Sequence, residues 1–151
     1  MMKIRTFAAL LAIAPLAACP GNAGPSSGPS PDATVTRLIA AAGQLAKQRG
    51  YSPSTTAPAT GELNNGTQED VGITLNQGRE YLMVGMCDGD CSDMDLQLFD
   101  PSGNKIAEDV LDDDVPVLEF RAAASGNHRI RVVMARCSAN PCSYGVSLYN
   151  K

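Results

Sequence analysis

Residues 94–103 read MDLQLFDPSG, and this stretch decides the fold class. Apolar side chains at every second position of residues 94–98 predict a strand with one buried face, and the DPSG of residues 100–103 predicts a turn. Six further short segments have strand patterns and turn residues between them: 71–76, 81–86, 104–107, 115–120, 128–136 and 144–148. Because no helical pattern separates them, they predict an all-β fold, an antiparallel β-sandwich or jelly roll, spanning residues 61–151.

Upstream of the strands, residues 32–50 carry apolar side chains at helical spacing. Asp32 or Thr34 is suited to cap the start of this helix, and Gly50 is suited to end it. The apolar stripe is narrow and rich in alanine, so we expect one short helix that lies on the surface of the domain. A partner-binding helix is the alternative. Residues 51–60, rich in Ser, Thr, Pro and Ala, are expected to form a linker.

The first 18 residues have the pattern of a signal peptide, with Lys3 and Arg5 before an apolar core too short to span a membrane. Leu16-Ala17-Ala18-Cys19 matches a bacterial lipobox, which predicts lipidation of Cys19. Residues 19–31 are then expected to form a disordered tether. The protein would be exported as a periplasmic or outer-membrane lipoprotein, and only this lipid anchor would touch a membrane. The alternative is free secretion, with cleavage after Ala18 or Ala23.

The charge of the chain excludes one class of partner. Its formal net charge is −4, and removal of residues 1–18 leaves ten basic against sixteen acidic residues. A protein this acidic is a poor candidate for binding nucleic acid or an anionic membrane surface.

Two close pairs of cysteines indicate an oxidising compartment. Of the five cysteines, Cys19 is assigned to lipidation, which leaves an even number for disulfides: Cys87, Cys91, Cys137 and Cys142. The spacing favours the local pairs Cys87–Cys91 and Cys137–Cys142, each closing a hairpin loop. A cross-link between the two loops is the alternative, whereas a Cys₄ zinc site fits the spacing poorly.

The loop enclosed by the first cysteine pair is acidic. Asp88, Asp90 and Asp93 offer hard oxygen ligands in a stapled loop, which makes calcium the candidate cofactor. The spacing is not that of an EF-hand. The alternative is a set of solvated turns in which aspartate is favoured for its local hydrogen bonds.

Three motifs, in order, resemble those of bacterial pre-peptidase C-terminal domains. Residues 93–103 are similar to the pattern D-x-D-L-x-L-x-D-P-x-G, and residues 75–81 to L-x-x-G-x-x-Y. Residues 125–132 resemble S-G-x-Y-x-[IV]-x-V, with His128 in place of the tyrosine. The resemblance covers roughly residues 60–149 and implies a compact β-sandwich accessory domain that binds macromolecules or aids secretion, sometimes with calcium. The protease that usually precedes such domains is not found in this sequence.

Catalysis has little support in this sequence. The single histidine, His128, lies in a predicted strand, and no nucleophile elbow, zinc-protease motif or phosphate-binding loop is present. A hydrolase would need a carboxylate pair in an apolar cleft, which is the least favoured reading. Phe99 and Tyr149 lie opposite the main apolar faces of their strands and are candidates for an exposed binding patch.

We therefore expect a non-catalytic accessory module that binds a protein or a polysaccharide, with the disulfide-stiffened loops as its contact edge. The alternative is a structural envelope lipoprotein without a specific ligand.

Overall fold

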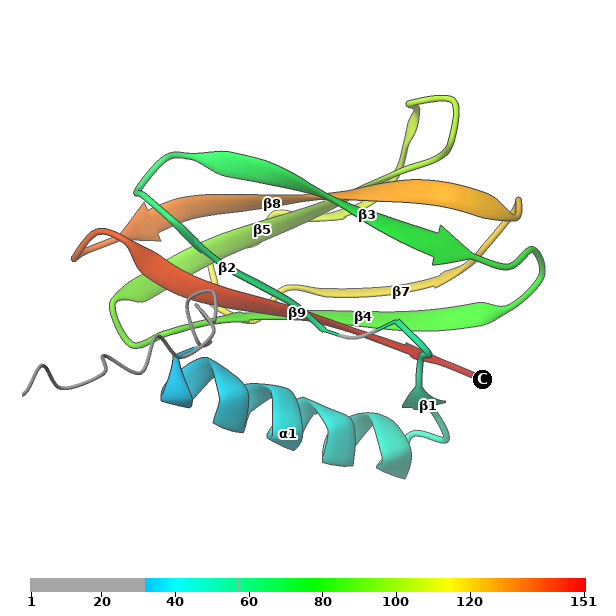
Figure 1. Cartoon of the computed structure of the whole chain (residues 1–151), viewed down its shortest axis with the longest axis horizontal. Helices are drawn as coiled ribbons and strands as arrows, with labels where there is room; N and C mark the ends of the chain where they lie inside the picture. Colours follow the sequence, from blue (N-terminus) through cyan, green and yellow to red (C-terminus); the bar gives the residue numbers. More distant parts are fainter. Residues whose placement is uncertain (1–31, 57) are drawn as a thin grey trace, which may run out of the picture.

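The computed structural model describes residues 32–56 and 58–151, and these form two antiparallel sheets and one helix (Figure 1). Sheet A has the strand order β1-β9-β4-β7, with β2 also paired to β9, and sheet B has the order β3-β8-β5-β6. The elements are α1 (Ala33–Gln48), β1 (Ser52–Pro53), β2 (Ala59–Leu63), β3 (Gln68–Leu75), β4 (Glu80–Cys87), β5 (Cys91–Phe99), β6 (Lys105–Asp109), β7 (Val117–Arg121), β8 (Gly126–Cys137) and β9 (Cys142–Asn150). The predicted β-sandwich is confirmed.

The main core lies between the two sheets and is built from the alternation that the sequence shows. Met94, Leu96 and Leu98 of β5 are fully buried, and the inward residues of β8 and β9 meet them from both sheets. The buried Tyr81 hydroxyl accepts a hydrogen bond from the backbone N–H of Asn76 at 2.9 Å, which satisfies its polar end. The main core is therefore formed by side chains from the two inner faces of the sheets.

A second, smaller cluster of buried residues lies on the outer face of sheet A, where α1 packs (Figure 1). The Asp32 side chain caps the helix by accepting a hydrogen bond from Thr34 N–H at 2.7 Å. Strand β4 is apolar on both faces because its outer side chain Leu82 lies under this helix. Tyr149 is 4% exposed in the same cluster. The expectation of an exposed binding patch at Tyr149 was therefore wrong, because α1 covers that face.

Close approach of α1 to the sheet depends on Gly145 of β9. A Cβ atom at this position would lie 2.9 Å from Cγ1 of Val35 and 3.1 Å from Cδ1 of Ile39. Only a residue without a side chain leaves room for the first turns of the helix. The amino-terminal half of α1 therefore lies over Gly145 and its neighbour Met86 in β4.

Residues 51–60 differ from the linker that their composition predicts. Tyr51 is buried beneath the end of α1, and Ser52–Pro53 pairs with β9 as β1. Ala59 already begins β2, which pairs with β9 along Ala59–Leu63. These contacts are mostly backbone hydrogen bonds, so a Ser/Thr/Pro-rich composition does not reveal them.

The predicted signal peptide, the lipidation site Cys19 and the tether at 19–31 lie outside the described residues. Within the described residues, no helix combines the length and the hydropathy that a membrane span requires.

Candidate functional site

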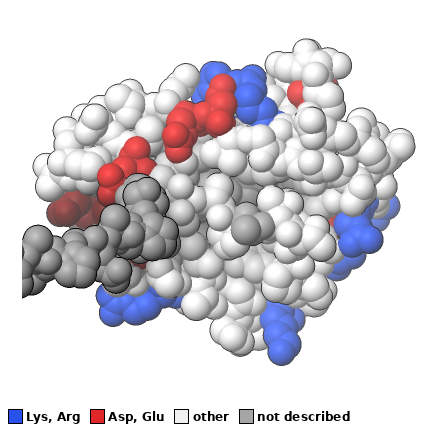
Figure 2. Space-filling model, viewed as in Figure 1, with Lys and Arg blue, Asp and Glu red and all other residues white. Residues whose placement is uncertain are grey.

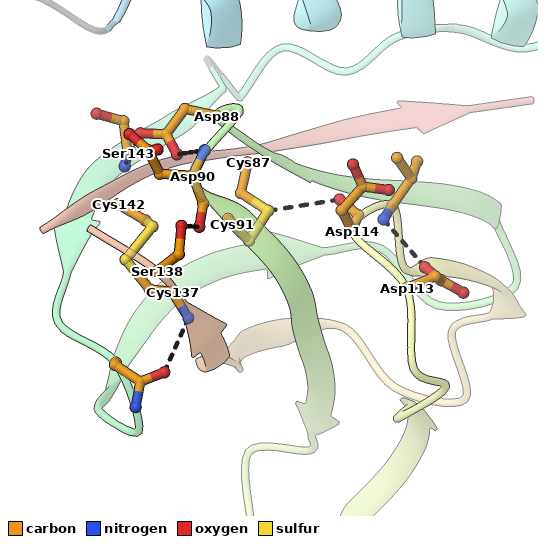
Figure 3. Close-up of a disulfide and its surroundings, with 12 residues drawn as sticks. Cys87, Asp88, Asp90, Cys91, Asp113, Asp114, Cys137, Ser138, Cys142 and Ser143 are labelled. Atoms are coloured by element: carbon orange, nitrogen blue, oxygen red, sulfur yellow. Dashed lines mark hydrogen bonds between the residues drawn. A yellow bond between two sulfur atoms is a disulfide. The ribbon is translucent and has the colours of Figure 1, made fainter. Parts of the chain in front are cut away.

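Both disulfides lie at one end of the sandwich (Figure 3). Cys87 pairs with Cys91 and Cys137 with Cys142, so the favoured local pairing is confirmed over a cross-link between the loops. The Cα atoms of each pair are 5.9 and 6.0 Å apart, which is the ordinary spacing for a disulfide across a hairpin loop.

Hydrogen bonds join the two stapled loops to each other. Asp88 N–H donates to the Ser143 carbonyl at 3.0 Å, and Ser143 N–H donates to Oδ2 of Asp88 at 2.6 Å. The backbone N–H and the hydroxyl of Ser138 both donate to the Asp90 carbonyl at 2.8 Å. This end of the molecule is therefore a rigid, cross-braced unit.

The three aspartates predicted to bind calcium are not brought together. Asp88 uses its carboxylate to accept from Ser143 N–H, and Asp93 lies 3.6 Å from the Arg136 guanidinium. Asp90 contributes its backbone carbonyl to Ser138. Among residues 32–56 and 58–151, no three His, Cys, Asp or Glu side chains form a group that could hold a metal ion. The calcium hypothesis stays a prediction.

The acidic segment between β6 and β7 uses its carboxylates to shape a turn. Oδ1 of Asp113 accepts from Val115 N–H at 3.0 Å, and Oδ2 of Asp109 accepts from Val117 N–H at 2.8 Å. The turn holds two valines at the surface, with Val115 43% and Val117 40% exposed. The acidic residues of this segment thus position two apolar side chains at the surface.

These two valines form one wall of an apolar groove of about 260 Å³ on the outer face of sheet A. The helix α1 forms the opposite wall, and β4 forms the floor. The lining residues are Leu38, Ala41, Ala42, Leu45, Ala46 and Arg49 of α1, Leu82, Val84 and Met86 of β4, and Val115 and Val117. Leu45 is 63% exposed and lies beside other apolar side chains of this groove. We call this site the α1–β7 groove.

Polar contacts close one end of the α1–β7 groove and tie α1 to β7. The Tyr51 hydroxyl and the Arg49 guanidinium each donate to the Glu119 carboxylate at 2.6 Å. The hydrogen bond from Tyr51 is the main cause that lowers the pKa of Glu119, and burial is the main cause that raises the pKa of Tyr51. The end of the groove is thus held by a charge-assisted network that fixes the width between its walls.

The remaining predicted residues lie away from this groove. His128 is 2% exposed on the inner face of β8, and its Nδ1 lies 3.1 Å from the Gly126 carbonyl. A histidine in this position has no access to a substrate in solution. Phe99 is half-buried, and the Arg129 guanidinium lies over its ring at 4.2 Å, so its face is not open for stacking.

Sequence reasoning missed the groove because its walls come from three distant segments. One signal was available: residues 81–86 are apolar at both alternations, which requires a cover on both faces of the strand. The only amphipathic segment outside the sheets was the predicted helix, so α1 was the natural cover. Which part of the face the helix leaves open could not be read from that pattern.

No protein-family model matches this sequence, and no curated protein matches it either. Solved structures do match. One is the pre-peptidase C-terminal domain of a collagenase from Bacillus anthracis, 15% identical, with a TM-score of 0.49 over 61% of this chain and 87% of that chain. Another is a periplasmic inhibitor of g-type lysozyme from Aeromonas hydrophila, 22% identical, with a TM-score of 0.43 over 61% of this chain and 84% of that chain.

The β-sandwich expected from the resemblance to pre-peptidase C-terminal domains is present in this structure. At this level of identity and overlap, neither match transfers a ligand or an activity to the chain.

Proposed function

We propose that this chain is an exported, non-catalytic binding module that holds a protein ligand in the α1–β7 groove. The observation that carries the proposal is the groove itself: an open apolar site whose walls include three exposed apolar side chains, Leu45, Val115 and Val117. Exposed apolar side chains that line one continuous groove, unlike single ones, are typical of a surface that meets a partner.

A protein ligand is favoured over a polysaccharide because sugar sites depend on exposed aromatic faces. Of the described aromatic residues, the four tyrosines are buried, and Phe99 and Phe120 are half-buried. The groove offers aliphatic side chains instead, and these suit the apolar anchors of a protein partner. This assignment moves the contact surface away from the disulfide-stiffened loops, whose groups are largely bonded to one another.

Two independent features support export of the protein. The chain begins with a signal-peptide pattern, and its two disulfides are stable in an oxidising compartment. Lipidation of Cys19 would tether the module to a membrane, with α1 beginning fourteen residues beyond the anchor.

Site-specific photo-crosslinking in exporting cells tests the proposal. A diazirine amino acid at position 45 would lie at the groove, and the same group at position 106 is the matched control, because Ile106 is 46% exposed but lies outside the groove lining. We expect a discrete protein adduct from position 45 alone, lost when Val117→Asp is added. Equal labelling from both positions, or no adduct from either, would support a passive envelope role instead.

A further inference from the structure

The outer face of sheet A is only partly covered by the described chain. Helix α1 packs over β9 and β4 through Val35, Ala46 and their neighbours (Figure 1). The outer face of β7 lies beside the helix, and Arg49 and Tyr51 reach it at one end through Glu119. Helices packed side by side lie about 8–10 Å apart, which is about the width of two strands. The α1–β7 groove therefore lies where the next helix on this face would rest.

The length of the groove also suits a helix. Its α1 wall runs from Leu38 to Arg49, which corresponds to about 16 Å, or three helical turns. An apolar stripe at positions i, i+3 or i+4, and i+7 would face Leu45 and Leu38 on one side and Val84 and Val117 on the other. An added strand fits less well. It would pair with the edge of β7, beyond Val117, and would leave the space between Val117 and α1 unfilled.

The acidic charge at one end of the groove determines which charge a partner should carry there. The wall residue Val115 directly follows three aspartates. Asp112 is paired with Arg136 at 2.9 Å and Oδ1 of Asp113 accepts from Val115 N–H, which leaves the exposed Asp114 carboxylate for a partner. Gly85 N–H donates to the Pro116 carbonyl at 2.8 Å, which places this acidic segment beside Met86 and the amino-terminal half of α1. Figure 2 shows the side of the molecule seen in Figure 1, with acidic groups toward the upper left and basic groups around its edge.

Building on the proposed function, we infer that the groove binds an amphipathic helix of a partner protein that carries lysine or arginine at the end meeting Asp114. A second copy of this chain offers no such helix. The exposed side of α1 presents Arg37, Gln44, Lys47 and Gln48, and its apolar stripe packs on sheet A apart from Leu45, which lies at the groove. A second copy would also bring its own acidic segment to the contact.

Three synthetic peptides of about fourteen residues test this inference by calorimetry against the purified protein. The first is a helix former with leucine at i, i+3, i+4 and i+7 and two lysines in its first turn. The second has the same composition with the leucines at alternate positions, which favours a strand. The third replaces the two lysines with glutamate. We expect saturable binding of the first, no binding of the second, and about tenfold weaker binding of the third at low salt.

Groove variants of the protein locate the binding. Leu45→Ser and Val117→Thr alter exposed side chains, so both variants should fold normally and weaken the first peptide by about tenfold. Ile106→Ser is the matched control and should leave the affinity unchanged. Binding that is indifferent to Leu45→Ser would overturn the inference.

The failure of the helix inference and the failure of the proposed function give different results. Binding of the alternating peptide rather than the helical one, or a photo-adduct from position 45 without binding of any of the three peptides, would refute the helical partner and leave a protein-binding groove. Light scattering of the purified protein tests whether a second copy of the chain occupies the groove. A dimer that Leu45→Ser dissociates would make a second copy the occupant and overturn the inference.

Discussion

The two outer faces of this sandwich limit the contact of apolar side chains with water in opposite ways. On sheet A, apolar side chains such as Leu82 and Tyr149 lie under α1. On sheet B, no described helix covers the face, and polar groups occupy it: Asp70 accepts hydrogen bonds from Arg129 and Arg131, and both guanidinium groups lie over Phe99. A sheet face that cannot be covered must be made polar. Sheet A departs from this rule beside α1, because its uncovered part, the α1–β7 groove, is apolar.

The sharpest difference between the faces lies at two glycines. Gly145→Val would drive a side chain into Val35 and Ile39, whereas Gly72→Val on β3 meets nothing within 4 Å. We expect Gly145→Val to lower the free energy of unfolding by about 2–3 kcal/mol and Gly72→Val to change it by roughly 0.5 kcal/mol or less. Urea unfolding of both variants checks this. Similar losses at the two positions would mean that α1 does not depend on close packing against sheet A.

These two faces also mark how far the sequence predicts the structure. Alternation along 94–98 and 128–136 identified strands of sheet B correctly, because one buried and one solvated face leave a period-two pattern. Strand β4 lacks that pattern, since both of its faces are covered. The same cause made Tyr149 read as exposed. Alternation tells which side of a strand faces the sandwich core, but it does not tell whether another element covers the opposite side.

The candidate site was less predictable than the fold for a related reason. In the acidic segment 109–114, Asp109 and Asp113 accept hydrogen bonds from the backbone of Val117 and Val115. These bonds set where two valines stand relative to a helix seventy residues earlier in the chain. Such a distance depends on tertiary packing, and no local pattern encodes it.

The next difference is the network through Glu119 that joins α1 to β7. No described helix is joined to sheet B in this way. Tyr51→Phe removes the donor to Glu119, so we expect the melting temperature to fall by a few degrees at neutral pH. Because this bond lowers the pKa of folded Glu119, its stabilisation is present above the unfolded pKa and is lost as the pH falls through the folded value. Melting curves of both proteins from neutral pH into acid should therefore converge.

Glu119→Gln is the control for that tie. It keeps an acceptor for the Tyr51 hydroxyl but removes the charge, so its melting temperature should vary less with pH than that of the parent protein. A constant gap between Tyr51→Phe and the parent across this range would show that the hydrogen bond is not coupled to ionisation of Glu119.

On the polar face, two aspartates should respond with opposite signs. Hydrogen bonds from Arg131 lower the pKa of Asp70, whereas burial, followed by the nearby Asp93, raises the pKa of Asp95. Asp70→Asn should destabilise the protein at neutral pH, and Asp95→Asn should stabilise it, each by less than about 1 kcal/mol because the groups are partly solvated. Both differences should vanish in acid, where the carboxyl groups are protonated in either state. Urea titrations at neutral and acid pH measure this, and effects of equal sign would contradict it.

The smallest effect is expected where the two sheets meet at the disulfide end. Oδ2 of Asp88 is bonded to Ser143 N–H and Oδ2 of Asp93 lies 3.6 Å from Arg136, whereas Oδ1 of Asp93 is buried without a partner in the described part of the chain. We expect calorimetry with calcium to show no saturable heat and the melting temperature to stay unchanged, since the described residues offer no group of three ligands. A saturable heat with a raised melting temperature, lost in Asp90→Ala, would restore the calcium hypothesis. It would also move the contact surface back from the α1–β7 groove to the stapled loops.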